Sequence, residues 1–278
     1  MSSHWKLDDI PWSDIQPDRV DRELLEAVKA AALVEANSAD YVRYLHNVFA
    51  ADESFKLSAS QWGREERQHG DALGQWAQII DPSFEYEHCL RQFRSGYQIP
   101  LEADTSVRGS CAGELVARCV VESGTCSFYS ALRDRSEEPV LKRIAGFIAQ
   151  DEARHYHLFK SHLQRHLEDT NIGMLERCRI AYKRVAEVDD DELAYAYYSA
   201  NIAPSAIKKP YERLDCARAY SARTLKLYEF EHVRSAAHMI LGAVDLKASS
   251  RLAKVCIWIA WKALQWHTRR LRRVALTH

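Results

Sequence analysis

The chain has 278 residues, 47% of them hydrophobic and 28% charged, a composition typical of a globular protein with a sizeable core. The 38 Lys and Arg residues nearly balance the 39 Asp and Glu residues, so the net charge of −1 gives no indication of nucleic-acid binding. Only 10 Gly and 7 Pro are present, which favours long uninterrupted helices over strands and turns.

Cysteine usage and the first residues indicate a compartment. The seven cysteines are scattered and form no C-x-x-C, which favours buried thiols in a reducing environment over disulfides. Residues Met1–Asp9 contain His, Trp, Lys and Asp where a signal peptide needs an apolar run. No segment reaches the roughly 18 uninterrupted apolar residues of a membrane span. We therefore expect a cytoplasmic protein.

Two helices with similar apolar stripes are predicted for the first eighty residues. The first begins at Asp18 or Asp21 and runs to about Phe49, and the second runs from about Asp52 or Ser54 to Asp81. The stripe of the first is Leu24, Val28, Ala31, Glu35, Ser38, Val42, Leu45 and Phe49. The stripe of the second is Phe55, Ala59, Trp62, Glu66, His69, Leu73, Trp76 and Ile80. Two glutamates and a histidine therefore occupy positions expected in the core.

A second pair of helices repeats this arrangement. After a connection over 82–105 that has room for a short helix, a third helix is predicted over about 106–134 and a fourth over about 137–166. The stripe of the third is Cys111, Leu115, Cys119, Glu122, Cys126 and Tyr129. The stripe of the fourth is Leu141, Ala145, Ile148, Glu152, His155, Phe159 and His162. Short links within each pair predict two antiparallel hairpins.

The remainder of the chain also reads as helical. Helices are expected at about 172–188, 190–202, 210–242 and 245–275. No linker or low-complexity stretch interrupts the chain, so residues 1–278 are expected to form one domain. Its core of four striped helices would span about 20–166, with accessory helices over about 170–275. The predicted fold is all-α, a four-helix bundle extended by further helices.

The candidate metal ligands are a motif that occurs twice. Glu66-x-x-His69 and Glu152-x-x-His155 each place a carboxylate and an imidazole on one helix face, and each follows a core glutamate, Glu35 or Glu122, by about thirty residues. One Glu-x-x-His alone is most often a solvated surface pair. Two of them in apolar stripes, each preceded by a glutamate at an expected core position, match the ligands of a carboxylate-bridged dimetal centre. With this ligand-bearing core over about 20–166, the predicted four-helix bundle is ferritin-like. Imidazole and carboxylate suit iron, and they suit manganese or a mixed site as well.

Neighbouring polar residues have separate interpretations. Glu65 is expected to be an exposed neighbour of Glu66. Asp151 and Arg154 are candidates for hydrogen bonds that orient the metal ligands. The remaining histidines of the fourth helix, His157, His162 and His166, are expected at the surface or in the core and not on the metal.

The motifs resemble those of soluble acyl-carrier-protein desaturases. Residues Trp62–Asp71 are similar to the W-x-x-E-E-x-x-H-G-D stretch of that family, and Asp151–His155 to its D-E-x-R-H motif. Glu122–Thr125 matches its E-x-x-T, and Glu35 with Tyr41 resembles its first ligand helix. The resemblance covers about residues 20–166. The D-E-x-R-H motif also occurs in multicomponent monooxygenases, so it does not by itself select desaturation.

The resemblance implies a diiron enzyme, usually a homodimer, that uses O₂ and electrons from ferredoxin to desaturate an acyl chain on acyl carrier protein. Its iron ligands would be Glu35, Glu66, His69, Glu122, Glu152 and His155. Thr125 would assist proton delivery, although a threonine on a helix can equally hydrogen-bond its own backbone. The alternatives are a diiron hydroxylase or N-oxygenase, a ferritin- or rubrerythrin-like protein for iron or peroxide, and a helical interaction protein without metal.

The last predicted helix carries a second pattern. The apolar residues 255–261 include two tryptophans and are followed by Lys262, Trp266, Arg269, Arg270, Arg272 and Arg273. A basic, Trp-rich amphipathic helix can contact an anionic membrane. The alternative is a packing helix with cations that suit its C-terminal dipole.

Overall fold

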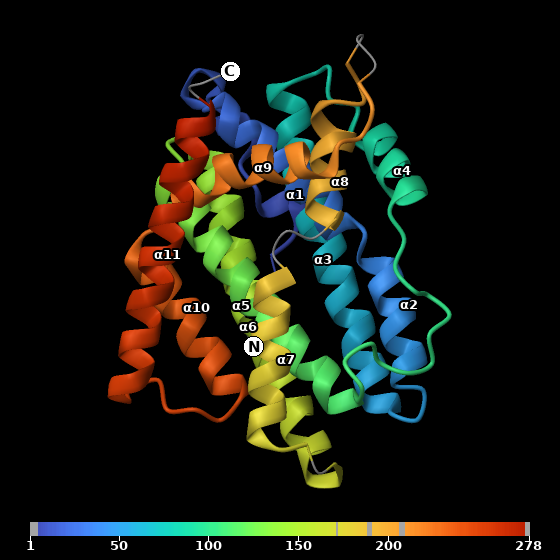
Figure 1. Cartoon of the computed structure of the whole chain (residues 1–278). Helices are drawn as coiled ribbons and strands as arrows, with labels where there is room; N and C mark the ends of the chain where they lie inside the picture. The colour runs from blue at the N-terminus through green and yellow to red at the C-terminus, as the bar shows by residue number, and fades with distance from the viewer. Residues whose placement is uncertain (1–4, 171, 188–190, 206–208, 276–278) are drawn as a thin grey trace. The chain divides into compact units, whose positions relative to one another are not determined.

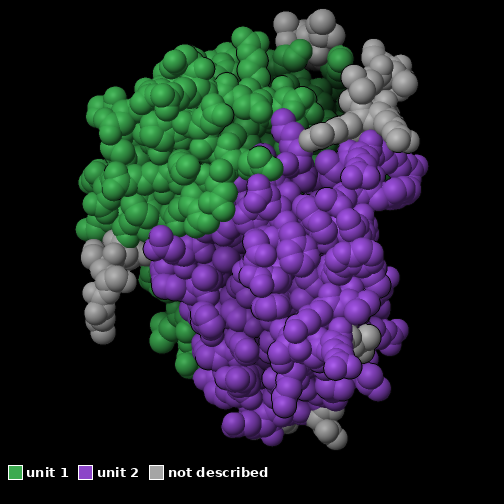
Figure 2. Space-filling view, turned by 90° about the vertical axis from the view of Figure 1, so that its left-hand side faces the viewer, with its two compact units in different colours: residues 1–104, 132–148, 189–223 green, residues 105–131, 149–188, 224–278 purple. Residues whose placement is uncertain are grey.

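The computed structural model describes residues 5–170, 172–187, 191–205 and 209–275 (Figure 1). The described residues are mostly helical and contain no strand, which confirms the predicted all-α class. The chain divides into two compact units (Figure 2). Unit 1 comprises residues 1–104, 132–148 and 189–223, and unit 2 comprises residues 105–131, 149–188 and 224–278. The organisation of the chain as one domain stays a prediction.

Helices from distant parts of the sequence make up each unit. The helices of unit 1 are α1 (Arg22–Ala36), α2 (Ser38–Val48), α3 (Glu53–Ile80), α4 (Tyr86–Gly96), α8 (Asp191–Asn201) and most of α9 (Arg213–Thr224). Those of unit 2 are α7 (Met174–Ala186), α10 (Phe230–Ala243) and α11 (Arg251–Ala275). Two further helices, α5 (Cys111–Arg135) and α6 (Pro139–Asp169), contribute residues to both units.

The first predicted helix is divided in two, which corrects the expectation of one helix to Phe49. Asn37 leaves the helical conformation with φ −84° and ψ 11°, and α2 begins at the next residue. Arg94 of α4 donates to the backbone oxygen of Ala36 over 2.6 Å and to Oδ1 of Asn37 over 3.3 Å. These bonds satisfy a helix-end carbonyl that the local sequence leaves open, so the interruption depends on tertiary contacts.

The second predicted helix is confirmed as α3. The Asp52 carboxylate accepts a hydrogen bond from the Phe55 amide over 3.0 Å and caps its N-terminus. Helix α3 packs antiparallel to α1 and α2, because Gly63 lies against Val42 while Gly70, further along α3, lies against Ala36. The predicted first hairpin is therefore present, and it brings the stripes of α1 and α3 together in unit 1.

The start of α6 is fixed by a buried carboxylate. Glu138 is 1% exposed and accepts hydrogen bonds from the amides of Val140 (3.2 Å) and Leu141 (2.7 Å). The same carboxylate accepts from the Trp76 indole over 2.8 Å, which ties this terminus to α3 within unit 1. Pro139 occupies the first turn of the helix as predicted.

The segment predicted as one helix over 210–242 is interrupted. Residues Leu225–Leu227 form a short 3₁₀ turn, and α10 starts anew at Phe230. The Glu229 amide donates to Nδ1 of His232 over 3.0 Å and caps the new helix. Among the described residues, no helix is long and apolar enough to cross a membrane.

Candidate metal centre

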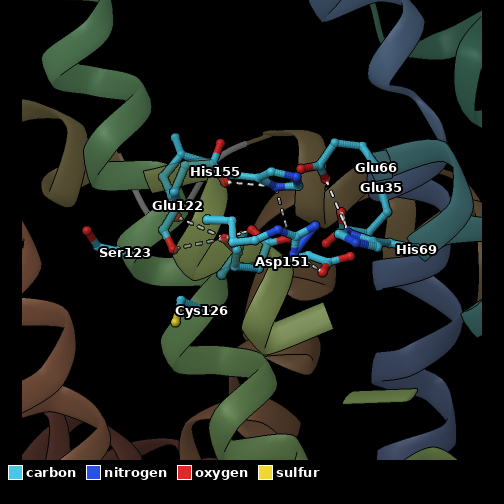
Figure 3. A network of polar contacts seen from close by, with 12 residues as sticks. Glu35, Glu66, His69, Glu122, Ser123, Cys126, Asp151 and His155 are labelled. Atoms are coloured by element: carbon cyan, nitrogen blue, oxygen red, sulfur yellow. Dashed lines mark hydrogen bonds and ion pairs between the residues drawn. The ribbon is translucent and has the colours of Figure 1, made fainter. Parts of the chain in front are cut away.

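The first ligand cluster lies in unit 1, between α1 and α3. Glu35 of α1 is 7% exposed, and Glu66 and His69 of α3 are 7% and 0% exposed. One ligand atom from each lies within 4.8 Å of the others. In Figure 3 the three side chains point toward one another. The i, i+3 spacing puts Glu66 and His69 on one face of α3, and the antiparallel contact with α1 brings Glu35 to that face.

The distances in this cluster suit one cation. Nδ1 of His69 is 3.8 Å from Oε2 of Glu35 and 3.8 Å from Oε2 of Glu66. Oxygen and nitrogen ligands bind metal ions at about 2.1 Å, so two ligands of one ion lie at most about 4.2 Å apart. Both separations are too long for strong hydrogen bonds and within the range of ligands that share an ion. The three residues can therefore hold a metal ion.

The electrostatics of the first cluster also favour a bound cation. Burial and the neighbouring Glu66 carboxylate together raise the pKa of Glu35 to about 8, although His69 acts in the opposite direction. Two buried carboxylates are costly to ionise side by side without compensation. A divalent cation supplies that compensation, since two carboxylates and a neutral imidazole around it give a neutral cluster.

A residue outside the predicted set also contacts this cluster. Trp5 is 8% exposed and stacks on His69, with ring centroids 6.0 Å apart and an interplanar angle of 4°. Gln68 Nε2 donates to the Trp5 backbone oxygen over 2.9 Å, and the indole also stacks on the Phe147 ring, with ring centroids 5.3 Å apart. Trp5 belongs to an irregular N-terminal segment without periodicity, so no sequence signal could have found it.

The second ligand cluster lies in unit 2 and has the same composition. Glu122 of α5 and the α6 residues Glu152 and His155 are each 1% exposed. One ligand atom from each lies within 4.8 Å of the others. Nδ1 of His155 is 3.7 Å from Oε2 of Glu122 and 3.8 Å from Oε1 of Glu152, close to the distances in unit 1. Figure 3 shows His155 directed toward Glu122. This cluster can likewise hold a metal ion.

Thr125 lies beside the second cluster. Its hydroxyl contacts Oε2 of Glu152 and lies 3.3 Å from the backbone oxygens of both Val121 and Glu122. The hydroxyl has one proton and three acceptors within reach. An ionised carboxylate is a stronger acceptor than a backbone carbonyl, so the geometry favours donation to Glu152. The contact with Glu152 is compatible with the predicted catalytic role of Thr125, and the contacts with Val121 and Glu122 are compatible with the predicted hydrogen bond to its own helix backbone.

Asp151 and Arg154 form a pair on α6. Nη1 of Arg154 donates to Oδ1 of Asp151 across one turn of the helix. The Asp151 side chain is 3% exposed and the Arg154 side chain 49%, so the pair links a buried carboxylate to the surface. This contact holds the Asp151 carboxylate in a fixed orientation one residue before the candidate ligand Glu152.

Three further residues of these helices lie outside the two clusters. Glu65, predicted from the sequence to be exposed, is half-buried and accepts from Gln61 over 2.8 Å, one turn away on α3. His157 is exposed and meets the edge of Tyr156. Nδ1 of His162 is 2.9 Å from Nη2 of Arg165. None of these three belongs to a ligand group found among the described residues.

No protein-family model matches the chain, and no curated protein sequence matches it. The assignment of the buried Glu and His clusters as a candidate metal centre therefore depends on their geometry. The relation to acyl-carrier-protein desaturases stays a resemblance of motifs.

Proposed function

We propose that the two clusters bind a pair of iron ions and that the protein is an O₂-dependent diiron oxidoreductase. The observation that carries the proposal is the duplicated Glu, Glu-x-x-His set, buried and with matching ligand distances in each unit. A chance surface pair would be neither buried nor repeated. Each set offers two carboxylates and one imidazole, which neutralise one divalent ion and suit iron or manganese.

The chain's own residues would have distinct roles around the metal. Glu35, Glu66 and His69 would hold one ion, and Glu122, Glu152 and His155 the other. A bound pair of reduced iron ions would supply the activation of dioxygen needed to attack an unactivated C–H bond. Thr125 would hold a proton at Oγ1 next to Glu152 and serve there as a proton donor. Asp151, fixed by Arg154, would keep the backbone and side chains of this helix turn in register.

The proposed substrate is a long acyl chain on acyl carrier protein, with a ferredoxin-type electron donor and a homodimeric enzyme. This part rests on the motifs in residues 62–71, 122–125 and 151–155, which resemble those of acyl-carrier-protein desaturases. Desaturation would remove two hydrogen atoms from the chain. Hydroxylation by the same kind of centre would instead add one oxygen atom.

The first test is metal content after anaerobic reconstitution with ferrous iron. We expect about two irons per chain in the natural protein and a loss of bound iron in Glu66→Ala and Glu152→Ala. Glu65→Ala on α3 and the exposed Glu168→Ala on α6 are matched controls that should keep the metal. No stoichiometric metal in the natural chain, or full metal in both ligand variants, would contradict the assignment.

The second test concerns the reaction. The iron-loaded protein is incubated with acyl-carrier-protein thioesters, O₂, ferredoxin and a ferredoxin reductase, and the acyl products are analysed by mass spectrometry. Loss of two hydrogens identifies a desaturase, and gain of an oxygen atom identifies a hydroxylase. Iron binding with uptake of iron beyond two per chain, and no change in any acyl substrate, would favour the storage alternative.

A further inference from the structure

Helix α11 has an inner face that packs within unit 2. Ala253 and Ile257 are 7% and 4% exposed, and Trp261 meets the Phe230 ring of α10 at 6.2 Å with an interplanar angle of 70°. Ala253, Ile257 and Trp261 are each four positions apart and therefore lie on one side of the helix. Figure 1 shows α11 alongside α10. This packing fixes which side of α11 faces outward.

The outer face of α11 exposes large apolar side chains. Val255, Trp258, Ile259 and Trp266 are 54%, 56%, 53% and 63% exposed. Their spacing of one, three, four and seven residues places them on a common stripe opposite the inner face. Two tryptophans exposed together are unusual on a soluble surface and mark a contact with an apolar partner.

Cations are interleaved with this stripe. The exposed basic residues of the helix are Arg251, Lys254, Lys262, Arg269 and Arg270. Nζ of Lys262 lies 5.6 Å from the Trp258 ring centroid, and the Arg270 guanidinium lies 5.7 Å from that of Trp266. Residues 251–275 contain no Asp or Glu. The side chains of Arg272 and Arg273, also predicted for this pattern, lie outside the described side chains.

We propose that this outer face of α11 docks on the surface of an anionic lipid membrane. Tryptophan rings favour the headgroup region of a bilayer, and Lys and Arg beside them reach lipid phosphates while their stems cover apolar surface. The stripe from Val255 to Arg270 spans 15 residue steps, or roughly 22 Å of helix, long enough to lie along a membrane plane.

The charge of the face argues against a second copy of the same helix as its partner. Two α11 helices laid against each other would bring only cations together in either direction, which is repulsive. An anionic lipid surface offers the opposite charge and an apolar layer at once. The inference depends on α11 alone and goes beyond the proposed metal chemistry.

Vesicle co-sedimentation of the full chain tests the proposal. We expect binding to vesicles of phosphatidylserine and phosphatidylcholine, little binding to phosphatidylcholine alone, and weaker binding at high salt. Lys262→Gln with Arg270→Gln should weaken binding tenfold or more, because each basic residue near an anionic surface contributes about fivefold. Trp258→Ala with Trp266→Ala should also weaken it, by about tenfold or more.

Two control substitutions test whether the loss of any exposed aromatic or basic residue has the same effect on vesicle binding. Tyr182→Ala, an exposed aromatic on α7, and Arg64→Gln, an exposed cation on α3, should leave binding unchanged. Metal-free and iron-loaded protein should bind vesicles equally, so failure of the metal assignment would not affect this result. Absence of binding to anionic vesicles, equal binding to neutral ones, or binding unchanged in both double variants would overturn the proposal. A shift in oligomeric state in the tryptophan variant, without vesicle binding by the natural chain, would overturn it in favour of self-association.

Discussion

At the scale of single residues, the buried carboxylates are the least expected feature of this chain. Glu35, Glu66, Glu122 and Glu152 all lie at 7% exposure or less. An isolated carboxylate at such a position costs several kcal/mol unless it is neutralised. The stripe positions predicted this burial from the sequence, because each glutamate replaces an apolar residue in a regular series. What the sequence could not supply was the neighbouring Trp5, whose place depends on a non-periodic segment.

The Thr125 hydroxyl offers a prediction about proton delivery that rests on the proposed function. Thr125→Val removes the hydroxyl that contacts Glu152 and keeps the side-chain shape, whereas Thr125→Ser keeps the hydroxyl. Both variants should retain the full metal content, since Thr125 is not a ligand. Product formed per O₂ consumed should fall about a hundredfold in the valine variant, the lower end of the typical effect of losing a positioned proton donor. Equal coupling in the serine and valine variants would show that the backbone contact is its whole role.

A buried ion pair gives a prediction about pH. Nζ of Lys29 is 2.6 Å from Oδ2 of Asp81, and the lysine side chain is only 9% exposed. Partial burial raises the pKa of Asp81, but hydrogen bonds from Lys29 and Ser83 and the Lys29 charge outweigh it, so the pKa is lowered overall. A carboxyl with a lowered folded-state pKa stabilises the fold above its unfolded pKa, and this stabilisation is lost as the pH falls through the folded-state pKa.

Asp81→Asn should therefore lower the free energy of unfolding by about 2 kcal/mol at neutral pH and by progressively less in acid. Urea denaturation at a series of pH values measures both the size and the slope of the effect. The exposed Asp104→Asn serves as the control. An Asp81→Asn curve that stays parallel to that of the natural chain down to acid pH would contradict the ion-pair argument.

At the scale of elements, the periodic helices were predictable and their interruptions were not. The stripes of α3 and α6 are buried nearly throughout, with Ile80 half-buried at the end of α3. The apolar spacing of the first helix continues without a change through Asn37, so nothing local marks the break between α1 and α2. The bonds from Arg94 to Ala36 and Asn37 come from a helix far along the chain. Tertiary contacts of this kind override local periodicity.

The contact between α1 and α3 predicts whether a substitution of Gly70 stabilises or destabilises the protein. A Cβ on Gly70 would lie 2.5 Å from the Ala36 nitrogen and 2.8 Å from the Ala32 oxygen, both backbone atoms that cannot rotate away. Overpacking costs about 1–3 kcal/mol, whereas alanine gains about 1 kcal/mol over glycine in helix propensity. Gly70→Ala should therefore destabilise the protein and disturb the ligand pair formed by Glu35 and Glu66.

Gly124→Ala on α5 is the matched control. A Cβ there would have no heavy atom within 4 Å, so only the helix propensity changes. This variant should be more stable by about 0.5–1 kcal/mol. Thermal unfolding of both variants, followed by circular dichroism, measures the two signs. Stabilisation by both substitutions would contradict this argument, because it would mean that α1 moves away from α3 without a loss of stability.

At the scale of the whole molecule, two sequence repeats became two clusters of the same composition, one in each compact unit. Their Glu and His residues come from α1 and α3 in unit 1 and from α5 and α6 in unit 2, and the two contributing segments of each cluster are about thirty residues apart in the sequence. The sequence could predict which residues share a helix face because helical spacing is short-ranged. It could not predict the division into units, since both draw on residues from before and after 170. That division depends on long-range contacts that no local pattern encodes.

The change in the free energy of unfolding on metal removal distinguishes a metal-binding cluster from a structural set of ion pairs. If the clusters bind metal, ferrous iron at a hundredfold excess over its Kd should raise the free energy of unfolding by about 2.7 kcal/mol per site, because the unfolded chain does not assemble the ligands. A chelator should reverse the gain.

Glu66→Gln should lose the stabilisation by iron in unit 1, and without metal this variant should be at least as stable as the natural chain. Without metal, the Glu66 carboxylate opposes ionisation of the buried Glu35, whose pKa it raises. If the cluster were instead a structural set of ion pairs with His69, the same substitution would destabilise the metal-free protein. Thermal unfolding of the natural chain, Glu66→Gln and the control Glu65→Gln, each with ferrous iron and with chelator under anaerobic conditions, decides between these two signs.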